Sequence, residues 1–182
     1  QQLAELSDQL EEFKTLARLK AEEADALRRA KSLLEQQLGP QASIGYDERG
    51  LVMRVVDRVL FDSGQAQVKP AGLKVLKQVS DVLKKLTDKQ IRIEGHTDNV
   101  PIGVKLREKF PTNWELSTAR ATSVVRHLIE EGGVDRAMLA AGGYADTQPL
   151  ESNETEAGKT ANRRIEIVLY PKDLGGIAGQ IK

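Results

Sequence analysis

The sequence lacks cysteine, net charge and any long apolar run. Without cysteine there are no disulfides, no thiolate metal sites and no thiol catalysis. The 27 basic residues are balanced by 27 acidic ones, so we expect no nucleic-acid partner, because such a partner calls for a basic face. No apolar stretch of these residues approaches the length that crosses a bilayer, and we expect no signal peptide among them. Because the first residue is Gln1 and not Met, we expect a cut within a longer protein, whose other segments would provide membrane attachment.

Glycine and proline are absent from the first 38 residues, which favours one uninterrupted helix. Heptads counted from Leu3 place apolar residues at nine of eleven a and d positions, as in a coiled-coil seam. We predict a homodimeric coiled-coil stalk over residues 1–38, ended by Gly39 and Pro40. A single helix packed on its own domain stays open, because short helices rarely stand alone in water. The seam positions are Leu3, Leu6, Leu10, Phe13, Ala17, Lys20, Ala24, Leu27, Lys31, Leu34 and Leu38.

Beyond residue 39 the pattern alternates between strands and helices. Strands are predicted within residues 51–61 and at 91–94, 138–144 and 164–170, and helices at 69–86 and 113–131. This order indicates an α/β (α+β) sandwich, with helices packed on a mixed sheet. We divide the chain into the stalk at 1–38, a linker with the first strand at 39–50, a domain at 43–171 and a flexible tail at 172–182.

A strand end and a helix start carry the candidate chemistry. Asp98 directly follows a predicted buried strand, and residues at loop starts face ligand clefts more often than others. Residues 112–115, with the sequence TNWE, match a helix capping box, so a helix begins near Asn113. On that helix Asn113, Ser117 and Arg120 share a stripe with apolar residues, which turns Arg120 inward. A buried guanidinium requires an anionic partner.

Two interpretations of this arginine stay open from spacing alone. Asp98 and Arg120 could form a structural ion pair that ties the strand to the helix. They could instead be two halves of a receptor for a zwitterion, with Asp98 accepting from an ammonium and Arg120 binding a carboxylate.

Four segments carry a resemblance to a known family: FDSG at 61–64, GHTD at 95–98, NWELSTARA at 113–121 and NRRIEI at 162–167. In this order they resemble the OmpA-like peptidoglycan-binding domain, shared by outer-membrane anchors, wall-associated lipoproteins and the flagellar stator protein MotB. The resemblance implies a non-enzymatic, cofactor-free wall anchor that holds the stem peptide of peptidoglycan, usually by its diaminopimelate residue. It implies that Asp98 takes the amino group and Arg120 the carboxylate. The pocket would be completed by Thr97, Asn113, Leu116, Ser117 and Arg163.

The loop over residues 99–112 is longer than in many members, and in this it looks most like the MotB branch. The resemblance therefore implies a periplasmic domain tethered to the inner membrane in a stator subunit. An outer-membrane protein or lipoprotein anchor is the alternative within the family. A cell-wall hydrolase and a coiled-coil scaffold are the alternatives outside it.

Other residues suggest chemistry that we set aside. Glu94, His96 and Asp98 could in principle ligate a metal, but we expect no metal and interpret His96 as a hydrogen-bonded residue at the strand end. Ser117, His96 and Asp98 do not fit a hydrolase, because Ser117 lies inside a helix without a nucleophile elbow. His127 and Glu131 suit a surface pair on a helix. Trp114 and Tyr144 are interpreted as packing residues, with the pocket rim as the other option for Trp114.

Overall fold

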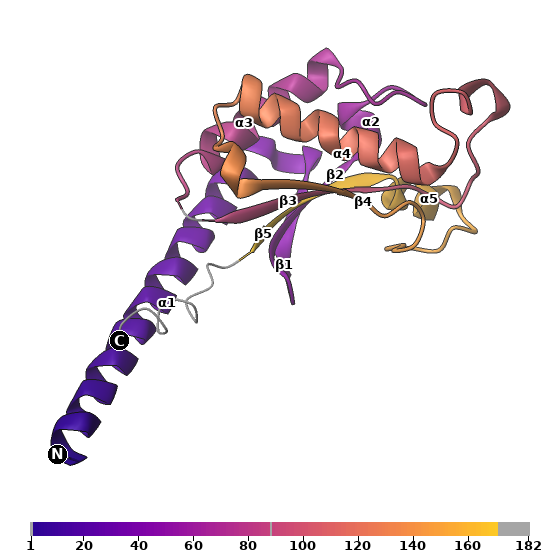
Figure 1. The fold of residues 1–182 in the computed structure, drawn as a ribbon. Helices are drawn as coiled ribbons and strands as arrows, with labels where there is room; N and C mark the ends of the chain where they lie inside the picture. The colour runs from indigo at the N-terminus through magenta and orange to yellow at the C-terminus, as the bar shows by residue number, and fades with distance from the viewer. Residues whose placement is uncertain (1, 88, 171–182) are drawn as a thin grey trace.

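The computed structural model describes residues 2–87 and 89–170, so the predicted tail at 172–182 lies outside the described residues (Figure 1). No helix in these two ranges combines the length and the apolar character needed to span a bilayer. Short 3-10 turns lie at Gly39–Gln41, Val104–Leu106 and Arg136–Met138. The main elements are α1 (Gln2–Leu38), β1 (Ser43–Asp47), β2 (Gly50–Val56), α2 (Asp57–Leu60), α3 (Pro70–Leu83), β3 (Gln90–His96), α4 (Asn113–Glu130), β4 (Leu139–Gly143), α5 (Glu156–Asn162) and β5 (Arg164–Tyr170).

The five strands form one mixed sheet in the order β1-β2-β5-β3-β4. Neighbouring strands are antiparallel except β3 and β4, which are parallel. Because side chains alternate along a strand, Ile165, Ile167 and Leu169 of β5 point into the core, while Arg164 and Glu166 lie on the opposite face. The predicted α+β class, with helices packed on a mixed sheet, is confirmed.

Helices α3 and α4 cover one face of this sheet (Figure 1). Two glycines permit the close approach of α4. A Cβ atom on Gly95 would overlap the carbonyl oxygen of Ser117, and one on Gly143 would overlap the hydroxyl of Thr118. A side chain at either glycine would push α4 away from the sheet, so these glycines hold the helix start close to the end of β3.

The start of α4 has the predicted capping box. The Thr112 hydroxyl accepts a hydrogen bond from the backbone nitrogen of Trp114 at 3.1 Å, and the Glu115 carboxylate accepts one from the backbone nitrogen of Thr112 at 2.7 Å. The helix therefore begins at Asn113, as the sequence predicts.

Two segments differ from their predictions. Residues 51–61 form strand β2 followed by the single helical turn α2, which the backbone nitrogen of Phe61 closes by donating to the carbonyl of Asp57 at 2.8 Å. A short apolar run is compatible with a strand and with a buried helical turn, so the spacing of its apolar residues could not distinguish β2 from α2. Helix α5 was not predicted, because its seven residues are mostly small or polar and have no apolar period.

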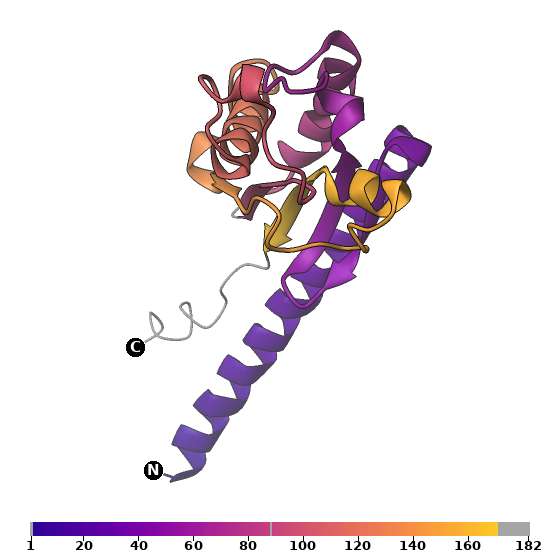
Figure 2. The same ribbon diagram turned by 90° about the vertical axis from the view of Figure 1, so that its right-hand side faces the viewer.

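Helix α1 has two ends in different environments (Figure 2). Its C-terminal end packs against α3 and β1 and contributes to the core of the domain. Its N-terminal end projects away from the domain, so the predicted dimer seam is open only there. The buried residues of α1 are the seam positions Leu27, Leu34 and Leu38 together with Ala30, and its exposed apolar seam positions are Leu3, Leu6, Leu10 and Phe13.

Candidate functional site

A cavity of about 500 Å³ lies at the end of β3, where α2, α4, the end of α5 and the loop 99–112 converge. Six of the seven predicted site residues line it: Thr97, Asp98, Asn113, Leu116, Arg120 and Arg163. The seventh, Ser117, does not reach the cavity. The volume lies within the range of small-ligand sites.

Arg120 points inward, as its position on the apolar stripe of α4 predicts, and its exposed fraction is only 4%. Val124 and Leu128, which follow it on the same stripe, are fully buried. Its Nη1 donates to the Asp57 carboxylate at 3.0 Å and its Nε donates to the carbonyl of Gln65 at 2.9 Å. Burial lowers the pKa of the Arg120 guanidinium, and the charge and hydrogen bond of Asp57 oppose that effect. Within the described residues no hydrogen bond uses Nη2, so one guanidinium nitrogen is left for a ligand.

Asp98 is held by other partners. Its Oδ2 accepts from Arg163 Nη1 at 2.6 Å, and its Oδ1 accepts from the backbone nitrogen of Val100 at 3.0 Å. The ion pairs among the described residues do not join Asp98 to Arg120. Arg163 Nε lies 3.9 Å from Asp57 Oδ1, so the two pairs are linked through Asp57.

The cavity therefore contains charges of both signs in alternation. Asp57 and Asp98 alternate with Arg120 and Arg163, and in total three acidic and four basic side chains line the walls. A ligand with charge of one sign would meet like charges at close range. A zwitterion can place an ammonium by the carboxylates and a carboxylate by the guanidinium groups.

The remaining predicted residues shape this cavity. Asn113 Nδ2 donates to the carbonyl of Val100 at 3.0 Å and fixes the start of the loop against α4. Leu116 packs with Ile102 and Phe110 in a small apolar cluster separate from the main core. The cluster holds the loop 99–112 down on the helix.

Ser117 acts from beneath the cavity. Its hydroxyl accepts a hydrogen bond from the backbone nitrogen of Ala145 at 3.1 Å, and the carbonyl of Ala145 accepts one from the backbone nitrogen of Thr97 at 2.8 Å. Ala145 has a φ of 51°, a conformation that is uncommon for residues other than glycine. Ser117 thus positions Thr97 through this turn.

Sequence reasoning missed Asp57 and Gln65, which hold Arg120. The signal was present: Asp57 is an acid within the apolar run 51–61, and an acid in a buried run needs a cationic partner. It also missed Lys159 of α5, which lines the cavity and lies 3.3 Å from Glu156.

The sequence profile of the OmpA family matches residues 60–163, more than half of the chain. The chain belongs to the OmpA family. Domains of this family are non-enzymatic and bind peptidoglycan, as the sequence motifs imply.

Similar proteins include motility protein B of Bacillus subtilis (strain 168), 33% identical over 84% of this chain and 59% of that protein. A MotB-like protein from Desulfovibrio vulgaris is 26% identical, with a TM-score of 0.78 over 86% of this chain and 99% of the solved one. The cell wall anchor of the T6SS from Pseudomonas aeruginosa is 30% identical, with a TM-score of 0.67 over 76% and 96%. The chain spans between 54% and 60% of the length of the first three curated relatives that it matches.

The arrangement around Ser117 in this OmpA-family domain does not form a hydrolase triad. The Ser117 hydroxyl donates to the carbonyl of Trp114 at 3.2 Å, within its own helix. The His96 ring stacks on Tyr144 with centroids 5.2 Å apart. The expectation that His96 is hydrogen-bonded is wrong, since neither ring nitrogen has a hydrogen-bond partner among the described residues, and Nε2 lies 3.7 Å from the Glu94 carboxylate. The ring is packed by its stacking on Tyr144.

A second charged cluster lies on the face of the sheet opposite α3 and α4. Glu94, His96 and Glu166 bring ligand atoms within 4.8 Å of one another. Arg49 bridges the two carboxylates, with Nη1 2.7 Å from Glu94 and Nη2 2.8 Å from Glu166. Its guanidinium already neutralises the oxygens that a metal would need, so we assign no metal to this cluster.

Glu166 is the centre of this cluster. It also accepts hydrogen bonds from Arg54 Nε at 3.0 Å and from Arg164 Nε at 2.8 Å. Burial tends to raise the pKa of Glu166, but the three arginines outweigh it and lower the pKa to about 2. The cluster is therefore a source of stability that depends on ionised Glu166.

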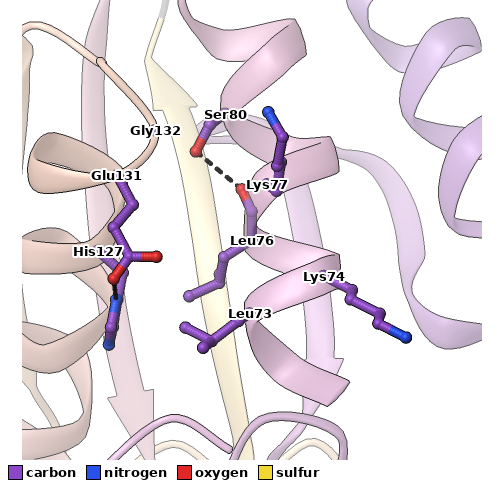
Figure 3. Close-up of a pocket in the computed structure, with 8 residues that line it drawn as sticks. All are labelled: Leu73, Lys74, Leu76, Lys77, Ser80, His127, Glu131 and Gly132. Atoms are coloured by element: carbon purple, nitrogen blue, oxygen red, sulfur yellow. Dashed lines mark hydrogen bonds and ion pairs between the residues drawn. The ribbon is translucent and has the colours of Figure 1, made fainter. Parts of the chain in front are cut away.

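A smaller cleft of about 270 Å³ lies between α3 and the C-terminal part of α4 (Figure 3). His127 Nδ1 lies 3.1 Å from the Glu131 carboxylate, which confirms the predicted surface pair. The Ser80 hydroxyl turns back to the carbonyl of Leu76 at 2.8 Å instead of facing His127. These three polar side chains do not form a catalytic arrangement.

Proposed function

We propose that this OmpA-family domain anchors a longer protein to the cell wall by holding the diaminopimelate residue of a peptidoglycan stem peptide. The observation that carries the proposal is the alternation of Asp57, Arg120, Asp98 and Arg163 around one cavity. The ligand ammonium would lie beside Asp98, and the ligand carboxylate beside Arg120 Nη2.

Binding of this kind leaves no buried charge uncompensated. Within the cavity Asp57 neutralises Arg120, and Arg163 neutralises Asp98. A zwitterion adds one charge of each sign, so each ion pair gains one further partner and the net charge of the cavity does not change. Because an unpaired buried charge costs several kcal/mol, a ligand of a single sign would be rejected.

The biological setting that we propose is a flagellar motor stator subunit of the MotB type, in the periplasm and tethered to the inner membrane. The long loop 99–112 and the similarity to motility protein B support it. A homodimer through the exposed seam Leu3–Phe13 would give two wall-binding sites on one stalk, and two linked sites hold a polymer more tightly than one. The alternative is an outer-membrane or lipoprotein anchor, and the sequence of the longer protein before Gln1 separates the two.

Sedimentation with purified sacculi tests the pocket. Asp98→Ala and Arg120→Leu should abolish retention while far-ultraviolet circular dichroism stays unchanged. Arg136→Leu, at an exposed arginine outside the cavity, is the matched control and should bind like the parent.

Four outcomes would contradict the proposal. Retention of both pocket variants would remove the pocket from wall binding. Unfolding of both would make the charges structural. Release of soluble muropeptides from the sacculi would identify a hydrolase, and absence of sacculus binding by the parent would favour a coiled-coil scaffold.

A further inference from the structure

Another concave surface lies on the outer side of α4. It is a groove of about 900 Å³ whose wall includes Trp114. Trp114 is 50% exposed, so its interpretation as a packing residue is wrong. A half-exposed tryptophan offers a large flat apolar surface together with one N–H donor.

The wall of this groove has a regular composition. Trp114, Thr118, Thr122 and Arg126 follow one another at intervals of four, so they form a stripe along three turns of α4, about 18 Å. The stripe thus presents one aromatic face, then two threonine side chains, then a guanidinium. The Thr118 hydroxyl lies against Gly143, and the Thr122 hydroxyl donates to the carbonyl of Thr118 at 2.9 Å, which leaves the Thr122 oxygen able to accept. A flat apolar ring beside the Trp114 N–H, the Thr122 oxygen and the Arg126 donors suits a ligand with apolar faces and hydroxyl-rich edges, which is the chemistry of a sugar.

The charged side chains of the groove already have partners within the domain, including Lys109, whose Nζ lies over the Phe110 ring at 5.2 Å from its centroid. Glu115 accepts from the backbone of Thr112, and Arg126 Nε lies 3.8 Å from the Glu130 carboxylate. The groove therefore favours an uncharged polar ligand over a strongly charged one.

The groove adjoins the zwitterion cavity. Asn113 lines the cavity and the next residue, Trp114, lines the groove. The wall between them is the small apolar cluster, in which Ile102 and Leu116 face the cavity and Phe110 faces the groove. A polymer with side chains could occupy both surfaces at once.

We infer that the groove binds the glycan strand of peptidoglycan, with Trp114 stacked against the face of a sugar ring. The inference rests on the proposed function. Because the stem peptide is covalently attached to the glycan, a domain that holds the peptide has the glycan within one peptide length of the cavity. The groove adjoins the cavity and has an exposed aromatic side chain, Trp114, at that end.

The chain offers a direct probe, because Trp114 is its only tryptophan. Intrinsic fluorescence should change saturably when peptide-free glycan strands, prepared by amidase digestion of sacculi, are titrated into the protein. The same change should occur in Arg120→Leu, because the cavity does not take part. Isolated stem peptide should bind the parent with little change in the fluorescence maximum.

Variants connect the groove to wall binding. Trp114→Ala should weaken sacculus binding about fivefold to a hundredfold, the range for removing one stacked aromatic contact, and Trp114→Phe should restore most of it. Tyr46→Ala is the matched control, because Tyr46 is 53% exposed on β1, outside both surfaces.

The results separate the two proposals. Stem-peptide binding without any fluorescence response to glycan, together with parental sacculus binding by Trp114→Ala, would overturn the glycan groove and leave the cavity intact. Glycan binding without stem-peptide binding would support the groove and contradict the cavity.

Discussion

Leu34 and Leu6 occupy equivalent seam positions of one helix but have opposite surroundings. Leu34 is 1% exposed within the domain core, and Leu6 is 63% exposed on the projecting end. Truncation of a buried leucine to alanine costs about 2–5 kcal/mol, from lost burial and the cavity that remains. Leu34→Ala should therefore lower the free energy of unfolding by about 3 kcal/mol, which for a chain of this size lowers the Tm by roughly 6–12 °C.

Leu6→Ala should change the stability of the monomer by less than about 0.5 kcal/mol, because it removes no contact with the domain. In a dimer the same leucine is buried once in each helix, at about 1.5–3 kcal/mol for each side chain. The dimer dissociation constant should therefore rise at least tenfold. The assays are urea unfolding at a concentration where the parent is monomeric, and sedimentation equilibrium across a concentration series.

This pair of variants has clear contradicting results. Equal loss of stability in both would mean that the whole of α1 packs on its own domain. No loss in Leu34→Ala would mean that α1 is an independent stalk up to its end. Unchanged self-association in Leu6→Ala would exclude the exposed seam as the dimer contact.

Two predictions concern buried charges. The pKa of Glu166 is about 2 in the folded chain against 4.5 for an ordinary Glu, so its ionisation contributes about 3 kcal/mol that is present above about pH 4.5 and lost as the pH falls towards 2. In urea unfolding, Glu166→Gln should have a lower free energy of unfolding than the parent at pH 7. That free energy should also change less than the parent's between pH 4.5 and pH 2. The same pH dependence in variant and parent would contradict this prediction. Lys89 is 3% exposed and paired with Glu23 of α1. Glu23→Gln should cost about 3–5 kcal/mol, because it leaves a buried ammonium, and the double variant with Lys89→Met should recover most of that loss; equal stability of Glu23→Gln and the parent would show that the pair does not hold α1.

The sequence predicted best where local rules decide the structure. The capping box gives the start of α4, and the apolar stripe through Val124 and Leu128 orients Arg120 inward, because both depend only on residues within one helix. The motifs at 95–98 and 113–121 then identified most of the predicted residues that line the cavity, because the two motifs lie on adjacent elements of a known fold.

The partners of Arg120 were beyond that reasoning. Spacing offered Asp98 as its partner, whereas Asp57 pairs with Arg120 and Arg163 pairs with Asp98. Asp57 lies in α2, a single turn whose apolar run reads equally well as strand. Arg163 follows α5, a helix without an apolar period. Ion pairs between residues so far apart in the sequence depend on how the strands assemble into the sheet, which local sequence patterns do not determine.

The sequence pattern likewise could not distinguish the two environments of α1. An a and d pattern buries the same leucines whether the partner is a second helix or the domain itself, so the pattern at Leu34 matches that at Leu6. Only the packing of α3 and β1 shows which end is docked.

Two stem peptides that differ by one carboxylate test whether the cavity selects a zwitterion. Isothermal titration should show binding of the diaminopimelate peptide and at least tenfold weaker binding of the peptide with lysine in its place, because lysine has the ammonium but not the carboxylate that Arg120 would hold. In Arg120→Leu the two peptides should bind equally weakly. Equal affinity of both peptides for the parent would show that the cavity does not select a zwitterion.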